Sequence, residues 1–178
     1  VLRLSGSLVE RETVDVTVGV VGDGIETEYE EVRVRAWLGE ASGEGRLSIS
    51  LPLAGRSLPE SILSVSLTPN TVEVNQLEGE VLIRGYLDAS SLYLGGEGAG
   101  PQFVEWPLGA SFEVRVPHTG FSGPVTWEPR VDVNVQEHYV ERGDEGAIIH
   151  VDGHVTARVA AYRTEFVTCL VNVSSSED

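Results

Sequence analysis

Apolar and polar residues alternate along most of this sequence. The clearest runs are 14–20 (VDVTVGV), 32–35 (VRVR), 113–116 (EVRV) and 131–136 (VDVNVQ), in which valine takes every second position. A period of two is typical of a strand with one buried and one solvated face, and β-branched valine suits such a surface. No segment carries the sustained i, i+3, i+4 apolar spacing of a capped helix. The pattern predicts an all-β fold, an antiparallel β-sandwich or jelly-roll-like arrangement with little or no helix.

Glycine and proline separate the predicted strands. We expect a loop at 95–101 and a hairpin loop at 142–146, between the strand runs 131–140 and 147–151. An Arg-Gly-Asp triplet lies in that hairpin, but turns favour such residues for backbone reasons, so we interpret it as turn chemistry and not as an adhesion signal. We divide the chain into an N-terminal β section, residues 1–53, and a main β-sandwich domain, residues 54–178.

The alternating N-terminal section is the candidate for a contact between subunits. Its apolar positions are Leu2, Leu4, Leu8, Val14, Val16, Val18 and Val20. A strand of this kind can add to the open sheet edge of a neighbouring subunit, because backbone hydrogen bonds supply affinity and alternate side chains fill pockets. The sequence therefore predicts that the partner of this chain is itself, in a homo-oligomer or a filament.

The charge of the chain limits the classes of other partner that it can bind. The chain has 28 acidic residues against 12 basic ones, which gives a formal charge of -16. Such a charge repels the phosphate backbone and anionic lipid surfaces, so we expect no nucleic-acid partner. No apolar run approaches the ~20 residues that a spanning helix needs, so we expect no membrane insertion either.

The sequence shows no pattern that points to catalysis or to a bound cofactor. It contains no phosphate loop, dinucleotide fingerprint or nucleophile elbow. His150 and His154 are four residues apart, but on a strand that spacing separates them by ~13 Å, too far for one metal ion. We therefore expect no enzyme activity, no metal site and no cofactor. The acidic clusters at 26–31 and 137–145 leave loose divalent-cation bridging between subunits as an expectation.

A carbohydrate-binding module is the alternative function. β-Sandwiches that bind sugars present a few exposed aromatic side chains for ring stacking. The candidates here are Trp106, Trp127 and Tyr93, since proline residues lie close to both tryptophans and suggest positions near strand ends.

The region from about residue 51 to residue 173 resembles a known β domain. The stretches that carry the likeness are Leu51-Pro52, 62–69 (ILSVSLTP), 79–87 (GEVLIRGYL), 92–94 (LYL), 112–117 (FEVRVP) and 167–173 (VTCLVNV). They resemble the β domain of spore-envelope morphogenetic proteins, the group that includes the stage VI sporulation protein D and its clostridial relatives.

That resemblance implies a role in assembly. Members of the family recruit or scaffold other envelope proteins, and the resemblance implies no catalytic residues. It also implies an extracytoplasmic location at a cell or spore surface, with other spore-envelope proteins as further partners. The chain shows no peptidoglycan-binding repeat and adds the alternating section 1–21. These departures favour a small self-contained building block of a spore-envelope layer or an extracellular filament.

Overall fold

The described part of the chain consists almost entirely of β-strands. The computed structural model describes residues 17, 19, 20, 25–96, 98–118, 123–143 and 146–175. Within these ranges it contains β1 (Ile25–Pro52), β2 (Pro59–Leu77), β3 (Glu80–Gly95), β4 (Gly100–Pro117), β5 (Thr126–Gly143) and β6 (Gly146–Ser175), and no helix. The described part of the chain thus offers no helical segment that could cross a membrane. The predicted all-β fold is confirmed.

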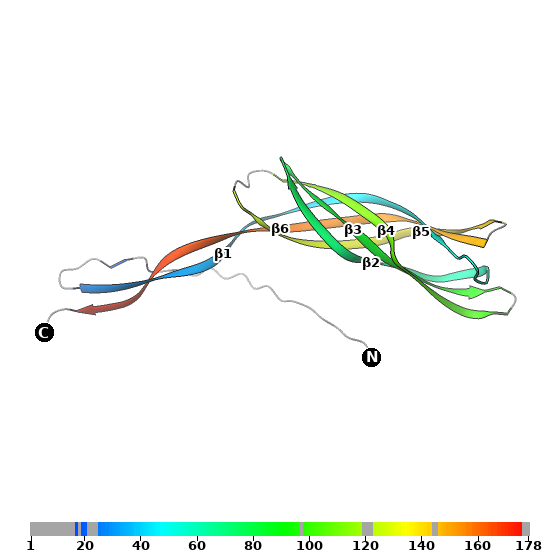
Figure 1. Ribbon diagram of the computed structural model, residues 1–178, viewed down its shortest axis with the longest axis horizontal. Coiled ribbons are helices and arrows are strands. Elements are labelled where there is room, and N and C mark those ends of the chain that lie inside the picture. Colours follow the sequence, from blue (N-terminus) through cyan, green and yellow to red (C-terminus); the bar gives the residue numbers. More distant parts are fainter. Residues whose placement is uncertain are drawn as a thin grey trace. The chain divides into compact units, whose positions relative to one another are not determined.

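The strands form two three-stranded sheets, with the orders β1-β6-β5 and β2-β3-β4 (Figure 1). In the second sheet each strand pairs antiparallel with the next, and the hairpin from β3 to β4 closes at the pair Gly95 and Gly100. In the first sheet β5 and β6 are antiparallel, and their hairpin closes at Gly143 and Gly146. Both turns lie where the sequence predicts them. The sheets pack face to face, so the predicted antiparallel β-sandwich is confirmed.

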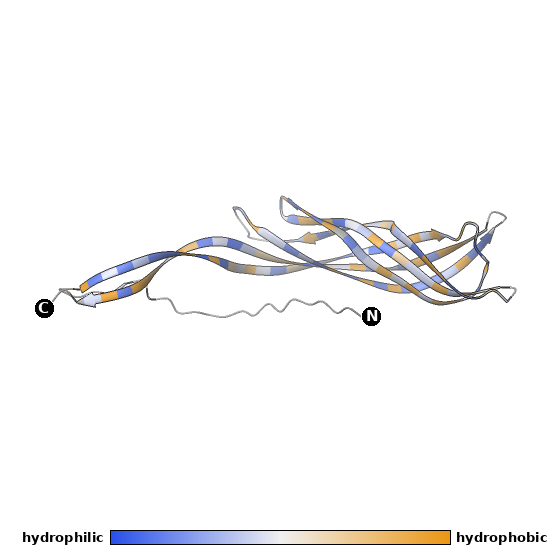
Figure 2. Cartoon of the chain, turned by 60° about the horizontal axis from the view of Figure 1, so that its bottom comes forward, coloured by the Kyte–Doolittle hydropathy of each residue, from blue (hydrophilic) through white to orange (hydrophobic). Residues whose placement is uncertain are grey.

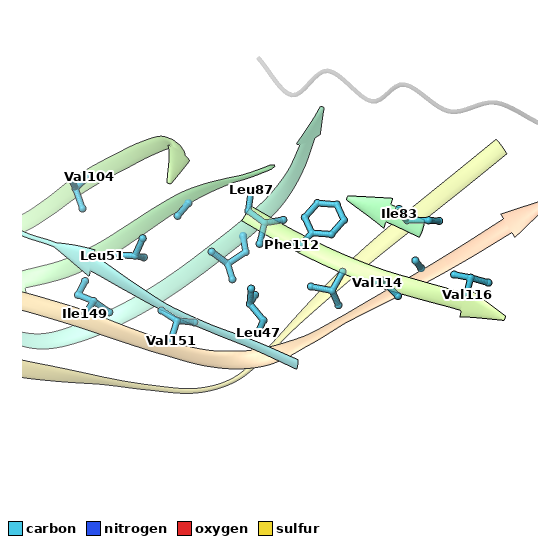
Figure 3. Close-up of a cluster of buried hydrophobic side chains, with 14 of the residues drawn as sticks. Leu47, Leu51, Ile83, Leu87, Val104, Phe112, Val114, Val116, Ile149 and Val151 are labelled. Carbon is cyan, nitrogen blue, oxygen red and sulfur yellow. The ribbon is translucent and has the colours of Figure 1, made fainter. Parts of the chain in front are cut away.

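The core fills the space between the two sheets. Along β3, the central strand of its sheet, every second residue from Val81 to Gly95 is buried, as the period of two requires. The alternation of apolar and polar positions is visible along the strands in Figure 2. Figure 3 shows side chains from both sheets meeting in one cluster, among them Ile83, Phe112 and Val151. Burial of this continuous apolar layer is the main force that holds the sandwich together.

Side-chain contacts and close backbone approaches join the edges of the two sheets. On one side, β1 passes close to β4, and the Trp106 Nε1–H donates to the carbonyl oxygen of Pro52 at 2.9 Å. A Cβ atom on Gly43 would lie only 2.3 Å from the carbonyl oxygen of Arg115, so this approach requires glycine. On the other side, β5 meets β2, where Arg142 Nη2 donates to the carbonyl oxygen of Pro59 at 2.7 Å.

The chain divides into two compact units. Residues 37–163 form one, here called the sandwich unit, and residues 1–36 together with 164–178 form the other, here called the ribbon unit. The predicted boundary between residues 53 and 54 differs from this division. Leu47, Leu51 and Leu53 are buried in the sandwich core, so the second half of β1 is a structural part of the sandwich.

Candidate assembly site

The described part of the ribbon unit exposes apolar side chains and buries none of them. Its described residues come mainly from the first part of β1 and the last part of β6, which are hydrogen-bonded neighbours in one sheet, and none of them is buried. The exposed large apolar residues there are Val20, Ile25, Tyr29, Val32, Phe166, Val171 and Val173. Two strands alone are marginally stable in water, and clustered exposed apolar groups mark interaction surfaces. The ribbon unit therefore has the composition of a surface that needs a partner.

The edge of β6 opens where its pairing with β5 ends. The last pair of that ladder joins Thr126 and Tyr162, while β6 continues to Ser175. Beyond the ladder, the backbone N–H of Leu170 donates to the carbonyl oxygen of Thr17 at 3.0 Å. Thr17 belongs to the section 1–21 that the sequence identifies as a candidate added strand. A backbone group of β6 thus pairs with that section.

Of the predicted donor-strand residues, the structure describes Val20. Val20 is 42% exposed, which leaves its side chain available for an intermolecular contact. Leu2, Leu4, Leu8, Val14, Val16 and Val18 lie outside the described residues. Their role as a donated strand stays a prediction.

The ribbon unit also carries a row of carboxylates. Glu26, Glu28 and Glu30 are exposed and alternate along β1, so they share one face of the strand. Neighbouring residues of one charge repel each other, and an opposing cation would relieve that repulsion. The described residues contain no group of three or more His, Cys, Asp or Glu side chains arranged to hold a metal ion.

The three candidate sugar-stacking residues do not form a platform. Tyr93 is 0% exposed and lies in the core, so the prediction that it stacks on a sugar is wrong: its alternation places it on the inner face of β3. The indole N–H of Trp106 is bonded to Pro52 at the β1–β4 side. That of Trp127 donates to Gln76 Oε1 at 3.2 Å on the β5–β2 side. Both tryptophans are half-buried against the core and belong to opposite edges of the sandwich.

One polar network crosses the outer face of the β1-β6-β5 sheet. Ser50 Oγ lies 3.0 Å from His150 Nδ1, and His150 Nε2 lies 2.8 Å from Glu141 Oε2. The ring of Tyr139 stacks on His150 with a centroid separation of 4.8 Å. The sequence analysis missed this network because its members lie on three different strands. Which residues of those strands lie side by side depends on the strand register, and the pattern within one strand does not show it.

A serine beside a histidine and a carboxylate also occurs in hydrolases, where the histidine activates the nucleophile. Here the three groups stand on a sheet face. A cavity of about 360 Å³ is lined by Glu141 but by neither Ser50 nor His150. The geometry therefore supports a cross-strand clamp that ties β1, β6 and β5 together.

Comparisons with protein-family models, with curated proteins and with solved structures find no match to this chain. The resemblance to the spore-envelope β domain stays a prediction that rests on the strand motifs alone.

Proposed function

We propose that this chain is a non-catalytic structural building block that assembles with copies of itself through β-strand pairing. The observation that carries the proposal is the hydrogen bond from Leu170 N–H to the Thr17 carbonyl oxygen. It brings the section before β1 to the part of β6 that lies beyond the β5 ladder. The exposed apolar residues of the ribbon unit supply the surface that such pairing would bury.

Strand pairing of this kind can form between two chains as well as within one. A backbone hydrogen bond has the same geometry whichever chain supplies the strand, so exchanging an identical segment between protomers costs little. A chain that gives its segment to one neighbour and receives a segment from another makes a head-to-tail contact. Such contacts close into rings or extend into filaments.

The partner that we propose follows from the strand pairing, and the location follows from the resemblance to the spore-envelope β domain. The partner is a second copy of the chain, and other spore-envelope proteins are further candidates through the resemblance. The proposed location is the extracytoplasmic cell or spore surface. Copies with a charge of -16 repel each other, so added salt or loosely bridging divalent cations should ease assembly by screening that repulsion.

Removing residues 1–21 is expected to abolish assembly. The full chain should show a molar mass that exceeds that of the monomer and rises with concentration, because each copy offers both a strand and an edge. The shortened chain should stay monomeric, because the donated strand is gone. Multi-angle light scattering on both proteins measures the difference.

A matched pair of full-length variants tests whether assembly needs the apolar side chains of residues 1–21 and not only the length of the chain. Val16→Glu with Val18→Glu changes the apolar positions of the section, whereas Asp15→Asn with Thr17→Ser changes the polar positions. The first pair should lose assembly and the second should keep it. Equal assembly of the full and shortened chains would contradict the proposal.

A further inference from the structure

Gly19 and Tyr29 lie against each other in the ribbon unit. A Cβ atom on Gly19 would stand 4.0 Å from the Tyr29 hydroxyl oxygen, which is van der Waals contact. Two positions earlier, the carbonyl oxygen of Thr17 accepts the hydrogen bond from Leu170 of β6, whereas Tyr29 belongs to β1. Section 1–21 therefore contacts the ribbon at two points, through a backbone bond to one strand and through a side chain of the other.

The alternation in section 1–21 fixes which face of the strand is apolar, but it does not fix the register. Residues 14–20 read VDVTVGV, with valine at every even position. A slip by one residue would turn the valines to the other face, whereas a slip by two residues would keep them on the same face. Another feature must therefore select one position along β6.

The glycine is the feature that distinguishes one register from those two residues away. The polar positions of the run are Asp15, Thr17 and Gly19, and only the last of them lacks a side chain. A slip by two residues would bring Thr17 or Val21 to the place of Gly19. Both are branched at Cβ, so their outer atoms would crowd a hydroxyl group that a Cβ atom alone already contacts. An aromatic side chain over a glycine is a known means of fixing strand register.

We propose that the contact between Tyr29 and Gly19 sets the register in which section 1–21 pairs with β6 of a second copy. A strand donated by another copy has the same sequence, so it meets the same exposed tyrosine. Backbone pairing supplies the affinity, and Tyr29 is a positioning residue that selects one register among those that the valines permit. This inference rests on the proposed function, since it requires strand exchange, and it names the residue that makes the exchange specific.

Filling the space at Gly19 tests the inference on the full chain. Gly19→Val should weaken self-association about tenfold or more, because the branched side chain meets Tyr29. Strand propensity alone predicts the opposite, since valine favours a strand more than glycine does. Adding Tyr29→Ala to the Gly19→Val chain should restore most of the loss, because it vacates the space.

Thr17→Val is the matched control for the association measurement. It introduces the same residue at the neighbouring polar position, and it should leave association within about twofold of the wild type. Light scattering over a concentration series compares the wild type with the three variants. A Gly19→Val chain that associates as tightly as the wild type would overturn the inference.

Disulfide formation with Cys169 measures the register directly. Each donor chain carries Cys169→Ser and one new cysteine, introduced by Asp15→Cys, Val16→Cys, Thr17→Cys, Val18→Cys or Val20→Cys. Each donor is mixed with an acceptor chain that keeps Cys169. With a wild-type acceptor the mixed disulfides should concentrate on one donor position, and with a Tyr29→Ala acceptor they should spread to positions two residues away. A Phe166→Ala acceptor should keep the wild-type pattern, since Phe166 is another exposed aromatic residue of the ribbon unit.

The outcomes distinguish this inference from the proposed function. If mixed disulfides form and the Tyr29→Ala acceptor leaves their pattern unchanged, Tyr29 does not set the register, although the proposed function stands. If no donor forms a mixed disulfide and the wild type stays monomeric, the proposed function fails. The role of Tyr29 is then decided within single chains that carry one new cysteine and keep Cys169. Internal disulfides that spread to other positions with Tyr29→Ala would support it, and an unchanged pattern or no internal disulfide would overturn it.

Discussion

Replacing Leu51 with alanine is expected to lower the free energy of unfolding of the sandwich by about 2–5 kcal/mol. Leu51 lies on β1 and is 1% exposed. It belongs to a core cluster with residues of β3, β4 and β6, such as Ile83 and Ile149 (Figure 3). The substitution removes buried methyl groups and leaves a cavity between two sheets that cannot fully collapse. Urea unfolding followed by tryptophan fluorescence gives the value.

Leu63→Ala is the control for the same change of side chain. Leu63 lies on β2 and is 52% exposed, so its truncation should change stability by about 0.5 kcal/mol or less. Equal effects at the two positions would mean that Leu51 is not in the core. The contrast also tests whether the second half of β1 belongs to the sandwich, because a separate N-terminal section would leave the stability of the sandwich unchanged.

Replacing Gly153 with alanine is expected to destabilise the protein by about 3 kcal/mol or more, near the upper end of overpacking effects. Gly153 lies in β6, the central strand of its sheet. A Cβ atom there would lie 2.3 Å from the carbonyl oxygen of Asn134 and 3.2 Å from Cα of Val135. Both obstacles are backbone, so β5 would have to move away and weaken its ladder with β6. Thermal unfolding by circular dichroism measures the loss.

Gly143→Ala provides the comparison on the neighbouring strand. The nearest atom to a Cβ at Gly143 is the carbonyl oxygen of Gly146 at 3.9 Å, an ordinary contact. This substitution should leave the free energy of unfolding within about 1 kcal/mol of the wild-type value, because the added methyl group meets no close atom and alanine restricts the unfolded chain more than glycine does. If Gly153→Ala lowered the thermal stability no more than Gly143→Ala, the result would contradict the close approach of β5 and β6.

The period of two identified the strands because it reports which face of a strand is buried. The runs 113–116 and 131–136 lie inside β4 and β5, with the valines directed inward. The same rule places Tyr93 in phase with Leu87 and Ala89, which are buried. That phase was the signal that Tyr93 is a core residue, and the sugar-stacking hypothesis overlooked it.

Other features depend on relations between strands, which alternation within one strand does not report. β1 is 28 residues long and serves both units, and its burial pattern shifts phase at Leu38 and Gly39, close to Ala36, where the units divide. Likewise, the contacts of His150 with Ser50 and Glu141 depend on the register of three strands. Gly153 faces a register shift in β5 between Val135 and Glu137, which the sequence of β6 alone does not reveal.

The candidate assembly site was predictable in one half only. Alternation singled out section 1–21 as a strand able to pair, and Thr17 within it does bond to β6. The receiving edge was not predictable, since it exists because the ladder with β5 ends at Thr126 and Tyr162 while β6 continues to Ser175.

The most direct test of strand exchange uses Cys169, the single cysteine of the chain, which precedes Leu170 on β6. Two donor variants each carry Cys169→Ser, one with Thr17→Cys and the other with Val18→Cys. Consecutive strand residues point to opposite faces, so only one of these positions shares the face of Cys169. Each variant is mixed with the wild type, oxidised and run on a non-reducing gel.

Pairing between copies predicts a mixed disulfide dimer from one of the two donor variants, and little from the other or from a Thr156→Cys variant that carries Cys169→Ser. Two observations together would contradict pairing between copies. Neither donor variant would form a mixed dimer with the wild type. A chain that carries Thr17→Cys or Val18→Cys and keeps Cys169 would instead form an internal disulfide and stay monomeric. Pairing would then occur within each chain, and the building-block account would be wrong.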